Sequence, residues 1–271
     1  MNFNKATLGF IGGGVMAENI LKGILQTGLM KKSQVIVSDV NASRLTLLKK
    51  QFGIKTEKDN KKIVSMSDII VLAVKPQNMK ELLTEVSCCC DNKKLFISIA
   101  AGVKSAAISR ALSGKGRIVR VMPNVAAKVL ESASAVCKGP LAKDDDIKTA
   151  LNIFNAIGKT VVVKEDLMDA VTGLSGSGPA YIFLFIDAMA DGGVKAGLPR
   201  KTALELAVQT FFGTSKLLLE TGETPATAKD QVTSPGGTTI CGLHALEKGA
   251  VRADIIDAVE AAIQRSKELG Q

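Results

Sequence analysis

Residues 7–20 read TLGFIGGGVMAENI, a short apolar run that breaks into three glycines and then resumes with the pattern of a helix. The run predicts a buried strand, and Gly12, Gly14 and Ala17 follow it at the G-x-G-x-x-G/A spacing of a dinucleotide-binding turn. Gly12 permits the tight turn, Gly14 lets the backbone approach a pyrophosphate, and the small Ala17 lets helix and strand pack closely. A glycine-rich turn without a ligand is the alternative. Because the motif lies between a strand and a helix, it favours nucleotide binding.

Composition excludes several classes of protein. The 271 residues are 46% apolar and 23% charged, which is typical of a globular chain with room for one large domain or two ordinary ones. Aromatic residues are scarce, with no Trp and one Tyr, which argues against stacking on nucleic-acid bases. The net charge of +9 comes from scattered lysines, so small anionic ligands are favoured over nucleic acid. No run of about 18 apolar residues predicts a membrane span.

The cysteines and the histidine lack the spacing of a metal site or a catalytic triad. The chain has five cysteines, of which Cys88, Cys89 and Cys90 are adjacent, and one histidine. We therefore expect no metal ion and no Ser-His-Asp triad, and we expect reduced thiols in a cytosolic protein. Lys5 is followed directly by the first strand, which leaves no room for a signal or transit peptide and predicts a cytoplasmic location.

Apolar runs alternate with helical segments up to residue 164. This alternation predicts a parallel, doubly wound α/β sheet, in which ligands bind beyond the carboxyl ends of the strands. After the first strand, we expect strands at 35–37, 68–75, 95–99, 117–121, 134–137 and 160–163, and helices at 14–27, 77–86, 105–112 and 145–157.

The end of the second strand should meet the adenosine ribose of a dinucleotide. An acidic residue at this position binds the 2′-hydroxyl of NAD, whereas small polar residues with an arginine suit the 2′-phosphate of NADP. The sequence offers both, because Asp39 favours NADH while Ser38, Asn41 and Arg44 favour NADPH. The cofactor preference therefore stays open.

From Glu165 onward the pattern is helical. We place a domain boundary there without a flexible linker, which gives domains 1–164 and 165–271. The almost wholly apolar helix at 181–193 is too short to span a bilayer and is typical of a core or a subunit interface, so we expect an obligate dimer. Further helices are expected at 201–220, 240–248 and 253–269.

Two glycine-rich turns interrupt the helical half. Residues 174–181 read LSGSGPAY, and residues 229–239 read KDQVTSPGGTT immediately before a helix. Glycines and threonines at a helix N-terminus present several backbone N–H donors to one point, which is a receptor for a carboxylate or phosphate. The alternative is an ordinary capping loop with Thr238 or Thr239 as the N-cap.

These blocks together resemble the pyrroline-5-carboxylate reductase family over essentially the whole chain. The resemblance implies a Rossmann-type N-terminal domain, a helical C-terminal dimerisation domain, and reduction of 1-pyrroline-5-carboxylate to L-proline with NADPH or NADH. It also implies homodimers that assemble further, often into rings of five dimers. The matching blocks are FIGGGVMAENI at 10–20, AVKPQ at 73–77, SIAAGV at 98–103, RVMPN at 120–124, GLSGSGPAYIF at 173–183, DGGVKAGLPR at 191–200, VTSPGGTTI at 232–240 and LHALEKGAVR at 243–252.

The resemblance also implies roles for single residues. Backbone N–H groups of the PGGTT loop would hold the substrate carboxylate, and the Thr239 hydroxyl would bind the ring nitrogen as the catalytic contact. The substrate set is Val232, Gly236, Gly237, Thr238 and Thr239. The cofactor set is Ile11, Gly12, Gly13, Gly14, Val15 and Met16 at the pyrophosphate, Ser38 and Asn60 at the adenosine, Ala73, Val74, Lys75 and Pro76 at the ribose, and Ile99, Ala100 and Ala101 at the nicotinamide. Asp39 and Arg44, at the end of the second strand, and Glu165, at the start of the helical domain, join this set by their position in the chain.

Several of these assignments have plainer alternatives. Asn60 lies in the stretch EKDNKKI, which is also typical of a charged loop. Glu165 could instead stabilise the dipole of the helix that it begins. His244, one turn into the helix after PGGTT, is expected to have a structural role.

Two other functions compete with the reductase hypothesis. A hydroxyacid dehydrogenase would use a helical lysine as proton donor, for which Lys195 is the candidate. A nucleotide-sensing scaffold would keep the turn at Gly12 and Gly14 but would not need the PGGTT loop, which is intact here.

Overall fold

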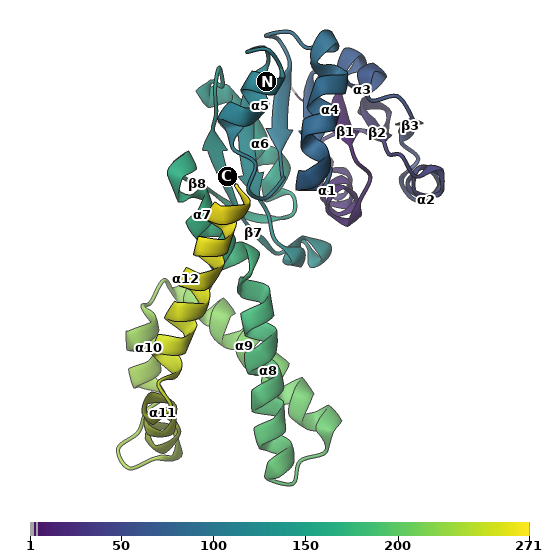
Figure 1. Cartoon of the computed structure of the whole chain (residues 1–271). Coiled ribbons are helices and arrows are strands. Elements are labelled where there is room, and N and C mark those ends of the chain that lie inside the picture. The colour runs from purple at the N-terminus through teal and green to yellow at the C-terminus, as the bar shows by residue number, and fades with distance from the viewer. Residues whose placement is uncertain (1–2, 4, 271) are drawn as a thin grey trace. The chain divides into compact units, whose positions relative to one another are not determined.

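The computed structural model describes residue 3 and residues 5–270 (Figure 1). The chain divides into two compact units, residues 1–177 with 261–271, and residues 178–260. The boundary between the units differs from the domain boundary predicted at residue 165, since residues 165–177 and the end of the chain pack with the first unit.

The first unit is built on a sheet that has eight strands within the described residues, in the order β3-β2-β1-β4-β5-β6-β7-β8. The first six positions reproduce the 3-2-1-4-5-6 order of doubly wound dinucleotide folds, and all five of their pairings are parallel. The strands are β1 (Leu8–Ile11), β2 (Val35–Ser38), β3 (Lys55–Glu57), β4 (Ile69–Leu72), β5 (Leu95–Ser98), β6 (Arg117–Met122), β7 (Ser132–Lys138) and β8 (Gly158–Val162).

Helices cover both faces of this sheet because successive strand residues point to opposite sides. Phe10 belongs to one buried cluster and Ile11 to another. The first cluster packs under α1 (Val15–Gln26), α2 (Ala42–Phe52) and α6 (Asp144–Asn155), and the second under α3 (Asn60–Met66), α4 (Met79–Val86) and α5 (Ser105–Ala111). The predicted doubly wound architecture is therefore confirmed.

One pairing departs from the predicted parallel arrangement, since β7 runs antiparallel to β6. The connection at residues 123–131 holds only the 3₁₀ turn Val125–Val129, and a parallel crossover needs about a dozen residues or more. Strand β8 then runs parallel to β7 through the crossover helix α6. Four short elements were also not expected from the pattern: α2, β3, α3 and α10 (Pro225–Gln231).

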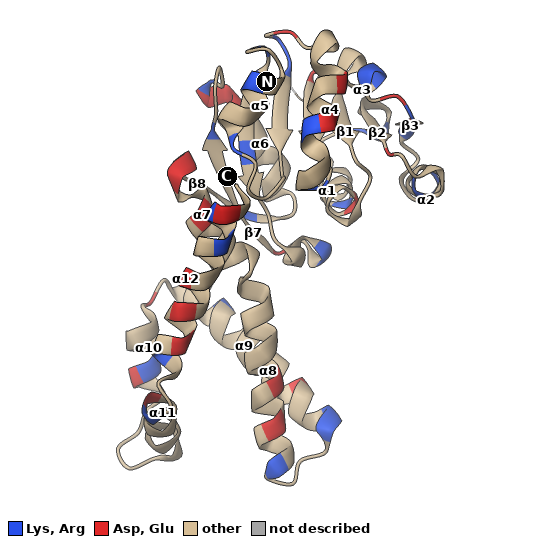
Figure 2. Cartoon of the chain, in the orientation of Figure 1, with Lys and Arg blue, Asp and Glu red and all other residues tan. Residues whose placement is uncertain are grey.

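The second unit contains α8 (Gly178–Lys195), α9 (Arg200–Thr221), α10, α11 (Thr238–Lys248) and the start of α12 (Val251–Leu269). Helices α8 and α9 pack through the small residues Ala190, Ala203 and Ala207. The apolar helix predicted at 181–193 is present as α8, but its large side chains lie outside this core: Phe183 is 62% exposed and Leu184 is 70% exposed. Figure 2 shows charge on α8 only toward its C-terminal half.

The last turns of α12 belong to the first unit. The Ser266 hydroxyl is buried and donates a hydrogen bond of 2.7 Å to the carboxylate of Asp169, a residue of α7 (Met168–Val171). Figure 1 shows the end of α12 beside α7. None of the described helices is long and apolar enough to cross a membrane.

Candidate active site

The glycine turn after β1 is fixed by contacts that only glycine permits. Gly12 has φ +99°, and a Cβ at this position would lie 2.7 Å from the Ala73 carbonyl oxygen. The Gly12 N–H donates to the Ser38 carbonyl oxygen at 2.8 Å. The turn, the residues after β4 and the end of β2 therefore meet at the carboxyl edge of the sheet, as the sequence predicts for the cofactor set.

Two charged side chains form hydrogen bonds with the backbone of Gly13, the next residue of the turn. Asp39 accepts the Gly13 N–H at 2.7 Å, and Arg44 Nε donates to the Gly13 carbonyl oxygen. A Cβ at Gly14 would meet no atom within 4 Å, and Gly14 caps α1 without a side-chain hydrogen bond. The exposed N–H groups at the start of α1 are thus open to an anion, and this cradle fits the pyrophosphate of NAD(P)H.

On the side predicted for the adenosine, Ser38 and Asn60 come together although they are far apart in the sequence. The buried Ser38 hydroxyl donates to Asn60 Oδ1 at 2.7 Å, and Asn60 Nδ2 donates to the Glu85 carboxylate at 2.9 Å. Asn60 opens α3, with Asp59 as its N-cap, so the charged-loop alternative is wrong. Glu85 was missed by the sequence analysis, because nothing in α4 signals that its side chain reaches α3.

The residues predicted for the ribose and nicotinamide follow two neighbouring strands. The Ile99 N–H donates to the Leu72 carbonyl oxygen at 3.2 Å, which continues the pairing of β4 with β5 to the point where both strands end. Residues 73–76 and 99–101 therefore lie at one edge of the sheet, and Lys75 and Pro76 are exposed there. This arrangement fits the ligand position of doubly wound sheets.

Glu165 caps a helix other than its own. Its carboxylate accepts the N–H of Ser105 at 2.7 Å and also the Ser105 hydroxyl, at the start of α5. Arg120, whose side chain is 8% exposed, donates to the same carboxylate at 2.8 Å. Burial tends to raise the pKa of Glu165, but the hydrogen bonds from Ser105 and the charge of Arg120 outweigh burial and hold this pKa below its usual value.

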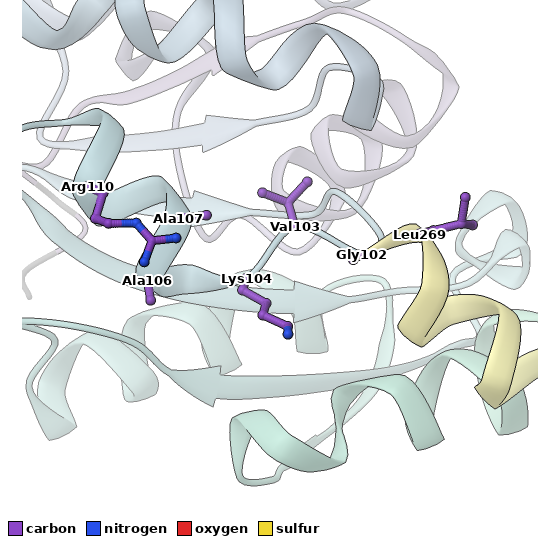
Figure 3. A pocket seen from close by; sticks show the side chains of 8 residues that line it. Gly102, Val103, Lys104, Ala106, Ala107, Arg110 and Leu269 are labelled. Atoms are coloured by element: carbon purple, nitrogen blue, oxygen red, sulfur yellow. The ribbon is translucent and has the colours of Figure 1, made fainter.

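The end of α12 lies against the loop that follows the predicted nicotinamide residues. A Cβ at Gly270 would lie 2.8 Å from the Gly102 carbonyl oxygen. Lys104, Arg110 and Leu269 are among the residues that line a cavity of about 600 Å³ beside this contact. In Figure 3, Lys104 and Arg110 lie on one side and Leu269 lies on the other. The C-terminal turn therefore supports the loop at residues 99–104 from outside.

In the second unit, the PGGTT loop leads into a helix N-terminus that has no side-chain cap. Gly236 has φ +66°, and Gly237 is the N-cap of α11 without a side-chain hydrogen bond. Thr238 and Thr239 are the first two residues of the helix, so the alternative that either of them is the N-cap is wrong. The backbone N–H groups of the first turn are left to bind an anion, with the half-buried Thr239 among them.

A π-helix at Thr172–Gly176 runs into the LSGSGPAY segment, where the sequence suggested a simple turn. Its i→i+5 pattern is closed by the Ser177 N–H, which donates to the Thr172 carbonyl oxygen at 2.8 Å. Asn124, from the MPN block, donates to the Ser175 carbonyl oxygen at 3.1 Å. Single-turn π-helices are frequent at functional sites.

Three other singled-out residues lie in the second unit. Val232 is 63% exposed at the end of α10. His244 lines a cavity of about 540 Å³ on α11 with Cys241 and Glu247. Lys195 is exposed at the last position of α8. Within the described residues, no group of three or more His, Cys, Asp or Glu side chains could hold a metal ion.

A glycine turn at the carboxyl edge of a 3-2-1-4-5-6 sheet, followed by a helical domain, defines an NAD(P)-dependent oxidoreductase. Residues 7–102 match the family described as NADP oxidoreductase coenzyme F420-dependent, and residues 165–269 match pyrroline-5-carboxylate reductase dimerisation. The chain belongs to the pyrroline-5-carboxylate reductase family.

Individual relatives match along nearly the whole chain. It is 49% identical to the pyrroline-5-carboxylate reductase of Methanosarcina acetivorans, covering 97% of this chain and 98% of the relative. It is 39% identical to that of Escherichia coli, with the same coverage. The solved reductase of Coxiella burnetii is similar with a TM-score of 0.94 and 36% identity, over 99% of this chain and 100% of that one. The reductase of Plasmodium falciparum, solved with NADP bound, has a TM-score of 0.88 and 33% identity, again over 99% and 100%.

Proposed function

We propose that the glycine turn holds NAD(P)H and the start of α11 holds the carboxylate of 1-pyrroline-5-carboxylate, which this chain reduces to L-proline. The observation that carries the proposal is the free N-terminus of α11, since Gly237 caps it without a side-chain bond. A carboxylate placed there gains hydrogen bonds from several N–H groups and the favourable end of the helix dipole.

The reaction adds a hydride to the imine carbon and a proton to the ring nitrogen, so that C=N becomes CH–NH. The reduced nicotinamide, when bound, supplies the hydride and is itself oxidised. The Thr239 hydroxyl, one residue inside the helix, orients the ring nitrogen and passes it a proton that ultimately comes from solvent. Most of the rate comes from holding the imine in a near-attack geometry, which demands no strongly acidic side chain.

The experiment that tests this proposal follows oxidation of NADPH and of NADH at saturating 1-pyrroline-5-carboxylate. We expect Thr239→Ala and Thr239→Val to lose activity on the order of a hundredfold, the cost of removing one hydrogen-bond donor from the reacting centre. Lys195→Ala is the matched control and should keep its activity. Loss in Lys195→Ala with retention in the Thr239 variants would instead support the hydroxyacid dehydrogenase alternative.

The assembly is proposed in the same way. The chain carries its family's dimerisation domain and forms a homo-oligomer. We propose that the unit of assembly is a homodimer formed through residues 165–271, and that the dimers associate further into a ring such as a decamer. The exposed apolar residues of α8 and α9 support the dimer, because about 60–70% of each side chain of Phe183, Leu184 and Phe212 is left to solvent in one chain. Sedimentation velocity at several protein concentrations would distinguish dimer from decamer.

We also propose a cytoplasmic location. The five cysteines are all free thiols, and only Cys88 and Cys89 have sulfur atoms close together, at 3.6 Å. Free thiols are typical of reducing compartments. Fractionation of the source cells with activity measured in each fraction would test this.

A further inference from the structure

Arg44 is the residue best suited to a 2′-phosphate, but the structure shows it already engaged by an internal carboxylate. Its guanidinium forms an ion pair with Glu18 of α1, and it also donates to the Gly13 and Gly14 carbonyl oxygens. The two charged side chains are mostly covered, with 20% of Arg44 and 25% of Glu18 exposed. Arg44 is therefore held on the glycine turn by its own protein.

The Glu18 carboxylate is held in this position from a second side. Gln51 of α2 donates from its amide nitrogen to the other Glu18 oxygen at 3.1 Å. The hydrogen bond from Arg44 outweighs burial and lowers the pKa of Glu18, so this carboxylate is ionised at neutral pH. Glu18 thus supplies the negative charge that Arg44 would otherwise pair with on a ligand.

The acidic candidate for ribose recognition is likewise occupied. Asp39 accepts the Gly13 N–H with one oxygen and the Asn41 N–H at 2.8 Å with the other. Asp39 therefore shapes the turn whichever cofactor is present. Of the other residues that favour NADPH, Ser38 donates to Asn60, and the Asn41 side chain accepts the Ser43 and Arg44 N–H groups. Arg44 is therefore the charged group left to discriminate between NADH and NADPH.

We propose that Glu18 sets the cofactor selectivity of this enzyme by competing with the 2′-phosphate of NADPH for Arg44. A 2′-phosphate binds Arg44 only at the expense of the Arg44–Glu18 ion pair, whereas NADH, which has a 2′-hydroxyl, leaves the pair intact. Glu18 therefore weakens NADPH binding selectively. The inference rests on the proposed placement of the adenosine end at Ser38 and Asn60.

The test measures nucleotide binding and needs no turnover. Calorimetric titration with 2′,5′-ADP and with 5′-ADP separates the contribution of the 2′-phosphate from that of the remaining nucleotide. In Glu18→Gln we expect the Kd of 2′,5′-ADP to fall about threefold to fivefold, the scale of a partly exposed ion pair. The Kd of 5′-ADP should stay the same. Glu81→Gln, an exposed neutral substitution on α4, is the matched control and should change neither.

A double-mutant cycle identifies Arg44 as the group for which Glu18 competes. In an Arg44→Ala background, Glu18→Gln should no longer improve binding of 2′,5′-ADP. Glu18→Asp, which keeps the charge but shortens the side chain, should fall between the wild type and Glu18→Gln, and thermal unfolding of each variant checks that it is folded. Unchanged or equally improved binding of both nucleotides in Glu18→Gln overturns the inference alone. Failure of wild-type protein to bind either nucleotide overturns the cofactor placement, and the inference with it.

Discussion

A Cβ on Gly12 would lie 2.7 Å from the carbonyl oxygen of Ala73, so the first glycine of the turn is fixed by its neighbour strand as well as by its own backbone angle. The contact joins the loop after β1 to the loop after β4. Both loops belong to the predicted cofactor set. A Cβ on Gly14, by contrast, would meet no atom within 4 Å, so we expect stability to depend on Gly12 and binding of NAD(P)H to depend on Gly14.

We expect Gly12→Ala to destabilise the protein by about 1–3 kcal/mol, because the new Cβ must occupy a left-handed backbone position and contact the Ala73 carbonyl. Gly14→Ala is the matched variant, since φ at Gly14 is −65° and a Cβ there meets nothing within 4 Å. It should leave the midpoint of urea unfolding unchanged and weaken NADPH binding, because the methyl group lies where the pyrophosphate approaches. Equal loss of stability in both variants would contradict this account.

Glu165 should stabilise the first unit in a pH-dependent way. The folded-state pKa of Glu165 is lowered. Its contribution to the free energy of unfolding is therefore fully present above its unfolded-state pKa of about 4.3, and this contribution is lost as the pH falls through the lower folded-state pKa. We expect Glu165→Gln to cost about 2 kcal/mol at pH 7, since Arg120 then loses a charged partner. Urea unfolding should show the difference between wild type and variant shrinking below pH 4.5 or so. A difference that stays constant with pH would assign the loss to packing.

Substitution of Gly236 should weaken the binding of substrate and leave the binding of cofactor unchanged. Its φ of +66° is a left-handed conformation that costs alanine about 1 kcal/mol and asparagine less. Gly236→Ala should therefore displace the N-terminus of α11 and raise the KM for 1-pyrroline-5-carboxylate, while Gly236→Asn should raise it less. The KM for NADPH should be unaffected in both. An increase in the KM for NADPH of similar size would show that the loop acts on the cofactor.

The exposed apolar face of α8 should be required for assembly. Leu184, which is 70% exposed, is a suitable position for Leu184→Glu, because a buried unpaired charge is strongly unfavourable in an interface. We expect the variant to sediment as a smaller species, and to lose the rise of Tm with protein concentration that is expected of the wild-type oligomer. Leu47→Glu, on α2 of the first unit where Leu47 is 47% exposed, is the control and should leave assembly unchanged. Dissociation by both substitutions would show that the added charge acts non-specifically and would contradict an interface on α8.

Local signals in the sequence predicted the strongly periodic elements and the two loops that define the family. The turn at Gly12, the strand ends at Ala73 and Ile99 and the helix after Gly237 were all expected, because a strand, a glycine and a helix start leave a signal within a few residues. The elements α2, β3, α3 and α10 were not predicted, although the three helices carry capping signals: Asn41 is the N-cap of α2 and Gly53 its C-cap, Asp59 caps α3, and Thr224 precedes Pro225 in α10. These elements are rich in polar residues, which obscured the apolar periodicity. The antiparallel pairing of β7 with β6 was also not predicted, because alternating strands and helices suggest parallel pairing.

What the sequence determined by itself is the fold class and the family, and it predicts the cofactor and substrate loops, since all of these depend on residue type and on short spacings. Only the tertiary structure decided which side chains meet across long separations. It brought Glu85 to Asn60, placed Glu165 at the start of α5, and paired Arg44 with Glu18. A carboxylate in a helix has the same local pattern whether it faces solvent or a partner. Its partner is fixed by the order and register of the strands, which place distant helices side by side.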